Sequence, residues 1–211
     1  MNILLLSQFL AVAGCAVGVV GIYARYIELR HRALPADRSA LKGSPSNGIL
    51  YAFTTGMAPW AKESTRIHMI AYLRGIGFHV GIFAAIVALI ASPFWNMLNR
   101  PLLVVLAGVL LVGALLGAAG GVLRIVELNL RRLSLPDDHF AVWLTTLFML
   151  VTAFGLISEA ARVPMYVIAA ATFVYIPLGK IRHCLYFFFS RTFFGKFFGR
   201  RAVYPHPEPI R

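Results

Sequence analysis

The chain has 211 residues, of which 59% are hydrophobic and only 13% are charged, and its formal net charge is +12. Soluble domains carry roughly 25% charged residues, so this composition excludes an ordinary soluble domain and predicts a membrane protein. A positive charge of this size can indicate nucleic-acid binding, but in a membrane protein it can also result from basic residues gathered on one side.

Five long apolar stretches follow one another along the chain: residues 1–24, 75–96, 101–123, 140–158 and 163–179. A bilayer core of ~30 Å needs about 17–25 helical residues, and these runs are too uniformly apolar for barrel strands. We therefore expect an all-α bundle of five transmembrane helices. The first stretch contains VAGC, which is typical of a lipoprotein cleavage site, but no basic residue precedes it. This favours a retained membrane helix over a signal peptide.

Basic residues are distributed very unevenly between the connections. Eighteen of the 20 Lys and Arg residues fall in residues 25–74, 124–132 and 180–211, and only Arg100 and Arg162 fall on the other side. The positive-inside rule then places the N-terminus outside and the C-terminus in the cytoplasm, and it explains the net charge without nucleic acid. We expect residues 1–190 to form the membrane domain and residues 191–211 an interfacial and extended cytoplasmic tail.

Two histidines lie at the predicted cytoplasmic margin of membrane spans, His79 in the second and His183 after the fifth. A histidine in hydrocarbon is costly unless its ring nitrogens are satisfied, and imidazole is a standard axial ligand of haem iron. If the fifth helix continues through His183, both rings can bind one haem from opposite faces. The cations expected to neutralise its propionates are Arg66, Arg74, Arg124, Lys180 and Arg182. The alternative is that both histidines bond loop carbonyls and hold no cofactor.

Other chemistry has little support in the sequence. Cys15 and Cys184 form neither CxxC nor CxxCH, so no disulfide framework, zinc site or c-type haem attachment is predicted. Neither a nucleophile–base pair nor a phosphate-binding loop is present, so the chain is not expected to be catalytic alone. His31 and His206 lie in polar segments and are expected at the solvated surface.

Two segments carry a resemblance to a known family: GFHVGIFAAIVALI around His79 and YIPLGKIRH ending at His183. With LSLPDDHF (residues 133–140), they resemble the membrane cytochrome b family of the respiratory nitrate reductase gamma subunit. They are also similar to the membrane haem subunits of sulfite-reductase-associated and heterodisulfide-reductase-like complexes. The resemblance covers roughly residues 66–191. It implies haem b, exchange with quinone, and a hetero-oligomer in a prokaryotic inner membrane with a cytoplasmic iron–sulfur subunit and, in some complexes, cytochromes c.

The chain departs from this family where a second, outer haem would be bound. The two expected histidine positions hold Leu89 and Met165, so the resemblance implies one haem rather than two. A second haem would need His68 and His139. The plainer expectation is that His68 bonds within its loop and that His139 caps its helix or pairs with the adjacent aspartates. We expect bulky side chains to fill part of the outer space and a quinone or lipid tail to occupy the rest, near Gly117 and Gly121.

The sequence thus favours a membrane cytochrome b subunit that passes electrons between the quinone pool and a peripheral redox partner. One alternative is a non-redox anchor or assembly subunit whose histidines are structural. Another is a small transporter, in which Glu159 and a histidine would face an aqueous path. Five dissimilar spans argue against the transporter, because transporters built from repeats show internal similarity.

Overall fold

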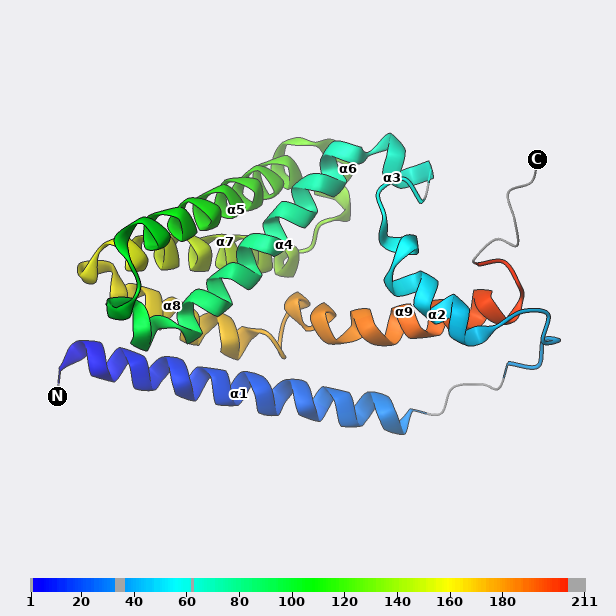
Figure 1. Ribbon diagram of the computed structural model, residues 1–211, viewed down its shortest axis with the longest axis horizontal. Helices are drawn as coiled ribbons and strands as arrows, with labels where there is room; N and C mark the ends of the chain where they lie inside the picture. Colours follow the sequence, from blue (N-terminus) through cyan, green and yellow to red (C-terminus); the bar gives the residue numbers. More distant parts are fainter. Residues whose placement is uncertain (1, 33–36, 62, 205–211) are drawn as a thin grey trace. The chain divides into compact units, whose positions relative to one another are not determined.

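The computed structural model describes residues 2–32, 37–61 and 63–204, and within these ranges every regular element is a helix (Figure 1). The α-helices are α1 (Ile3–His31), α2 (Pro45–Phe53), α3 (Glu63–Ile67), α4 (Met69–Ile90), α5 (Arg100–Val126), α6 (Leu128–Leu133), α7 (Pro136–Ile157), α8 (Arg162–Tyr175) and α9 (His183–Arg200). Short 3₁₀ turns cover Thr55–Met57, Ser92–Met97, Glu159–Ala161 and Lys180–Arg182. The all-helical prediction is therefore confirmed for the described part of the chain.

Helices α1, α4, α5 and α7 are each long and apolar enough to cross a membrane. A fifth span results only if the segment Glu159–Tyr175 is joined to Lys180–Arg200 across the break between them. The structure thus supports a multi-pass helical membrane protein with four or five spans.

The predicted fifth span, residues 163–179, corresponds to α8, which ends earlier, at Tyr175. The cause is local: Ile176 is still helical, but Pro177 has no backbone N–H and so cannot continue the helical hydrogen-bond ladder. Only the short turn Lys180–Arg182 precedes the next helix, α9, which begins at His183. One premise of the haem prediction was that the fifth helix continues through His183. The structure does not have this continuous helix.

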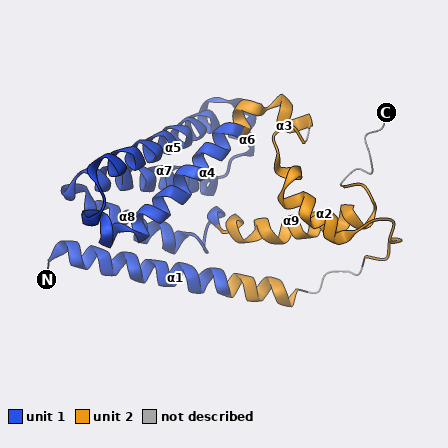
Figure 2. Ribbon diagram, in the orientation of Figure 1, with its two compact units in different colours: residues 1–23, 73–181 blue, residues 24–72, 182–211 orange. Residues whose placement is uncertain are grey.

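The chain divides into two compact units, which are described separately below (Figure 2). Unit 1 contains residues 1–23 and 73–181, and unit 2 contains residues 24–72 and 182–211. The functional division expected at residue 190 stays a prediction.

Unit 1 is held together by close helix packing, in which α5 packs on α7 and α7 on α8. Its core contains Phe148, Leu110 and Met149, each almost completely buried. Helices α4 and α5 meet at two glycines: a Cβ built on Gly81 would lie 2.8 Å from the Cα of Gly113. Small residues allow this approach of two backbones, which dispersion contacts then stabilise in a membrane.

The first part of α1 packs on α8 through a row of small residues. Its buried residues are Ser7, Ala11, Gly14 and Gly18, spaced three or four apart and therefore on one side of the helix. A Cβ on Gly14 would lie 2.8 Å from the backbone of Ala170. This contact holds the first part of α1, up to Tyr23, in unit 1.

Unit 2 is built on the contact between α2 and α9. Gly48 of α2 lies against Gly195 and Gly199 of α9, where an added Cβ would overlap the backbone of the facing helix. Beside this contact, the Arg201 guanidinium binds both carboxylate oxygens of Asp37, at 2.8 and 3.0 Å. This pair holds the pKa of the Asp37 carboxyl well below its ordinary value. The glycine contact and the ion pair together hold the tail helix to the first loop.

Candidate functional site

His79 lies on the exposed side of α4, and its ring orientation is defined by its own helix. Its Nδ1 is 2.7 Å from the carbonyl oxygen of Gly75, one turn earlier. A carbonyl oxygen only accepts hydrogen bonds, so Nδ1 carries the proton and the ring lone pair is on Nε2. The same arrangement fixes the tautomer of many metal-binding histidines.

The glycines around His79 have different surroundings. A Cβ on Gly77 would overlap the side chain of Leu116, and a Cβ on Gly81 would meet Gly113, so both positions belong to the contact with α5. A Cβ on Gly75 would meet nothing within 4 Å. The face of α4 that carries Gly75 and His79 is therefore open beside the histidine, whereas the face next to it is packed.

Two of the predicted propionate partners, Arg74 and Arg124, lie near the start of α4 and the end of α5. The Arg74 side chain passes beside Gly120 of α5, with its Nε 3.7 Å from the position a Cβ would take there. Arg124, one turn further along α5, donates to the Ser134 hydroxyl at 3.2 Å. Unit 1 thus brings together the cations of α4 and α5.

Lys180, another predicted propionate partner, forms an ion pair within unit 1. Its Nζ lies 2.5 Å from Oδ1 of Asp138, whose side chain is 7% exposed. The other oxygen of Asp138 accepts the N–H of Leu135, and the Tyr175 hydroxyl donates to Asp137. These contacts tie the start of α7 to the end of α8.

His139 follows these aspartates and is half-buried in the first turn of α7. The side-chain bonds described for Asp137 and Asp138 go to Tyr175, Lys180 and the Leu135 N–H. The expected pairing of His139 with the aspartates is therefore not the arrangement observed in the described residues.

The remaining predicted residues belong to unit 2. His183 is the first residue of α9 and is exposed, and Arg182 lies in the turn before it. Arg66 is exposed in α3, and His68 joins α3 to α4 with its N–H bonded to Ser64 and its carbonyl to Tyr72. Each predicted histidine pair, His79 with His183 and His68 with His139, thus has one member in each unit, so both pairings stay predictions. His206 lies outside the described residues.

Leu89 and Met165, the positions at which the sequence resemblance predicts the missing outer haem ligands, are both buried in the core of unit 1. Met165 is fully buried, and its Sδ lies 2.8 Å from the position that a Cβ on Gly155 would take. Gly117 and Gly121, the expected neighbours of a quinone, instead lie against Phe78 and Trp143. Side chains occupy these positions, which leaves this part of the quinone prediction without structural support.

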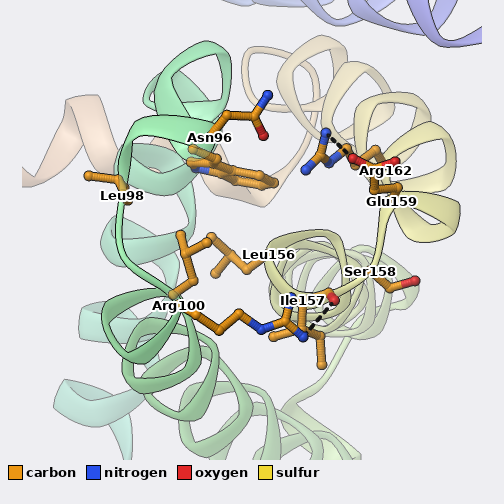
Figure 3. A pocket seen from close by; sticks show the side chains of 10 residues that line it. Asn96, Leu98, Arg100, Leu156, Ile157, Ser158, Glu159 and Arg162 are labelled. Carbon is orange, nitrogen blue, oxygen red and sulfur yellow. Dashed lines mark hydrogen bonds and ion pairs between the residues drawn. The ribbon is translucent and has the colours of Figure 1, made fainter.

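A cavity at the opposite end of unit 1 was not predicted from the sequence. It has a volume of about 380 Å³ and lies where α4 and α7 end and α5 and α8 begin (Figure 3). Arg100 and Arg162 both line it. The sequence signal was that these are the only two basic residues on their predicted side of the membrane, but their convergence is a property of the fold.

Comparison with family models, with curated proteins and with solved structures gave no match to this chain. Among residues 2–32, 37–61 and 63–204, no cluster of three or more His, Cys, Asp or Glu side chains is arranged to hold a metal ion. A haem bound by two histidines does not require such a cluster, because its porphyrin supplies the other four ligands.

Proposed function

We propose that this chain is a b-type cytochrome subunit of a prokaryotic cytoplasmic-membrane complex, passing electrons between the quinone pool and a cytoplasmic iron–sulfur partner. The observation that supports this function most is the state of His79. It lies in an apolar helix of membrane-spanning length, and the Gly75 carbonyl selects the tautomer with its lone pair on Nε2. Such a histidine is suited to bind haem iron.

The residues around His79 fit a haem edge. The open position at Gly75 leaves room for a flat group beside the ring, where a larger side chain would obstruct it. Arg74 and Arg124 supply positive charge for the propionates, and His183 of unit 2 is the proposed second axial ligand. When bound, haem b supplies one-electron transfer, and the protein holds the iron and balances the charge of the carboxylates.

Lys180 has a supporting role in this proposal. Because it is paired with Asp138, it contributes to haem binding chiefly by fixing the end of α8 next to the segment that leads to His183. Arg66 and Arg182 are proposed to balance propionate charge from unit 2. The partner subunits and the quinone follow from the resemblance to the nitrate reductase gamma family.

The decisive experiment is a reduced-minus-oxidised visible spectrum of the purified protein, with haem measured per chain. We expect about one haem b per chain. His79→Ala and His183→Ala should each abolish haem incorporation, because loss of one axial ligand leaves a weakly held cofactor. His31→Ala, which changes an exposed histidine at the end of α1, is the matched control and should retain full haem content.

Full haem content in both ligand variants would refute the assignment of His79 and His183 and direct attention to His68 and His139. A wild-type protein that contains no haem, even when expressed with excess haem precursor, would instead favour the non-redox anchor.

A further inference from the structure

We propose that the cavity at the start of α5 and α8 binds the phosphate group of an anionic phospholipid. This inference does not depend on haem binding, because the cavity lies at the end of unit 1 opposite Arg74 and Arg124. It rests on the charge of the cavity, on an unsatisfied hydrogen-bond donor, and on the position of the cavity at the ends of membrane helices.

The ionisable side chains of the cavity carry a net positive charge. Arg162 forms an ion pair with Glu159 at 3.3 Å. Arg100 donates to the main-chain oxygen of Ile157 at 3.4 Å, and no carboxylate among the described residues pairs with it (Figure 3). One positive charge is therefore left uncompensated, which suits a ligand with a single negative charge such as a phosphodiester.

Arg162 also has an unsatisfied donor. Its Nε is buried and has no hydrogen-bond partner among the described residues. The guanidinium is held in place, since it lies 5.9 Å from the ring centroid of Trp95 and is only 22% exposed. A buried donor without an acceptor is unfavourable, and a phosphate oxygen that reaches it from the cavity would satisfy it.

The walls of the cavity distinguish a lipid from a free anion. Buried Trp95, Leu103 and Leu156 form an apolar part of the lining, while Asn96 and Ser158 add polar groups. The Trp95 indole is fixed by a bond from Nε1 to the Ala88 oxygen at 3.0 Å. Three helices of membrane-spanning length, α4, α5 and α7, begin or end near the cavity. The cavity is therefore expected at the depth of lipid headgroups, where tryptophan and arginine commonly lie. A phospholipid offers both the phosphate and apolar glycerol and acyl atoms for these walls.

The test titrates the purified full chain in neutral detergent with phosphatidylglycerol, and separately with phosphatidylcholine, and counts bound lipid by native mass spectrometry. We expect the double variant Arg100→Gln/Arg162→Gln to bind phosphatidylglycerol about tenfold or more weakly than the wild type. The control is Arg131→Gln/Arg132→Gln, which removes the same charge from two exposed arginines of α6 and should change the affinity by less than twofold.

A second variant keeps the proposal testable if the double variant does not fold. Asn96→Asp adds a negative charge to an exposed side chain of the cavity without changing its size, and it should also weaken binding of phosphatidylglycerol. Wild-type affinity in both variants would overturn the proposal. Equal binding of phosphatidylcholine, or displacement of the lipid by millimolar inorganic phosphate alone, would overturn the assignment to an anionic phospholipid.

Discussion

Gly113 is a position where one added methyl group should weaken the packing of α5 on α4. A Cβ there would lie 2.8 Å from the Cα of Gly81 and 3.1 Å from Sδ of Met149. The backbone of α4 cannot move aside without disturbing the core around Met149, which is fully buried. Gly108, on the same helix, has nothing within 4 Å of the corresponding position.

We predict that Gly113→Ala lowers the free energy of unfolding by about 1–3 kcal/mol, because the added methyl overpacks the α4–α5 contact. The matched control Gly108→Ala should be neutral or stabilising by up to about 1 kcal/mol, because alanine favours a helix over glycine. Circular dichroism during unfolding in mild detergent measures both. Equal unfolding midpoints for the two variants would show that the close contact between α4 and α5 is not formed.

At the scale of elements, the ion pair of Lys180 with Asp138 joins the start of α7 to the end of α8, beside the hydrogen bond from Tyr175 to Asp137. Asp138 has a side chain that is 7% exposed, and Lys180 is 51% exposed. Removing the lysine leaves a buried carboxylate whose hydrogen-bond donor in the described part of the chain is the Leu135 N–H, with Arg124 as the remaining positive charge that acts on it. Removing both charges leaves no buried carboxylate without its cation, and an asparagine at 138 can still accept the hydrogen bond from the Leu135 N–H.

We therefore predict that Lys180→Gln destabilises the protein by about 1–3 kcal/mol, less than for a fully buried pair because solvent reaches the lysine. The double variant Asp138→Asn/Lys180→Gln should recover most of that loss. A double-mutant cycle of unfolding free energies gives the coupling between the two residues. Additive effects would mean that the ion pair contributes nothing to the joint.

The sequence predicted the membrane helices well and their ends poorly, because the two depend on different properties. Apolar runs locate hydrocarbon, but a helix can extend beyond it: α1 reaches His31, well past the apolar run that ends at residue 24. Likewise α4 begins at Met69 and ends at Ile90, before Pro93, although the apolar run covers 75–96. Hydropathy does not register either the backbone bonds that continue a helix or the proline that limits it.

The candidate site was only partly predictable for a related reason. The bond of His79 to Gly75 is local, four residues apart on a helix, and follows from helical geometry. The partners of Asp137 and Asp138 come from residues about forty positions later, and Arg100 and Arg162 converge from separate helices. Such contacts depend on tertiary packing, which the spacing of residues in one sequence does not reveal.

At the scale of the whole molecule, the number of spans decides on which side of the membrane the basic tail lies. With four spans, the two termini share a side, and with five they lie on opposite sides. Four helices are each long and apolar enough to span a membrane. The number of spans is five if the segment Glu159–Tyr175 also crosses, and four if it does not. Its helical residues reach about 26 Å at ~1.5 Å per residue, close to the ~30 Å of a bilayer core.

The charge distribution favours five spans. Residues 25–32 hold Arg25, Arg30 and Arg32, and residues 180–211 hold seven Lys or Arg residues. The segment from the end of α7 to the start of α8 holds only Arg162. If Glu159–Tyr175 did not cross, the tail would lie on the same side as the N-terminus and opposite the basic residues at the end of α1. The positive-inside rule disfavours that arrangement, because it would separate two strongly basic segments.

We therefore predict that the N-terminus lies outside and the C-terminus in the cytoplasm. Green fluorescent protein fused after residue 211 should fluoresce, whereas alkaline phosphatase fused there should be inactive, because the first folds in the cytoplasm and the second requires export. Phosphatase fused after Arg162 should be active and serves as the matched control, since a single crossing separates the two fusion points. An active phosphatase after residue 211 would show that Glu159–Tyr175 does not cross, and it would place His183 on the opposite side of the membrane from the end of α4 that carries His79.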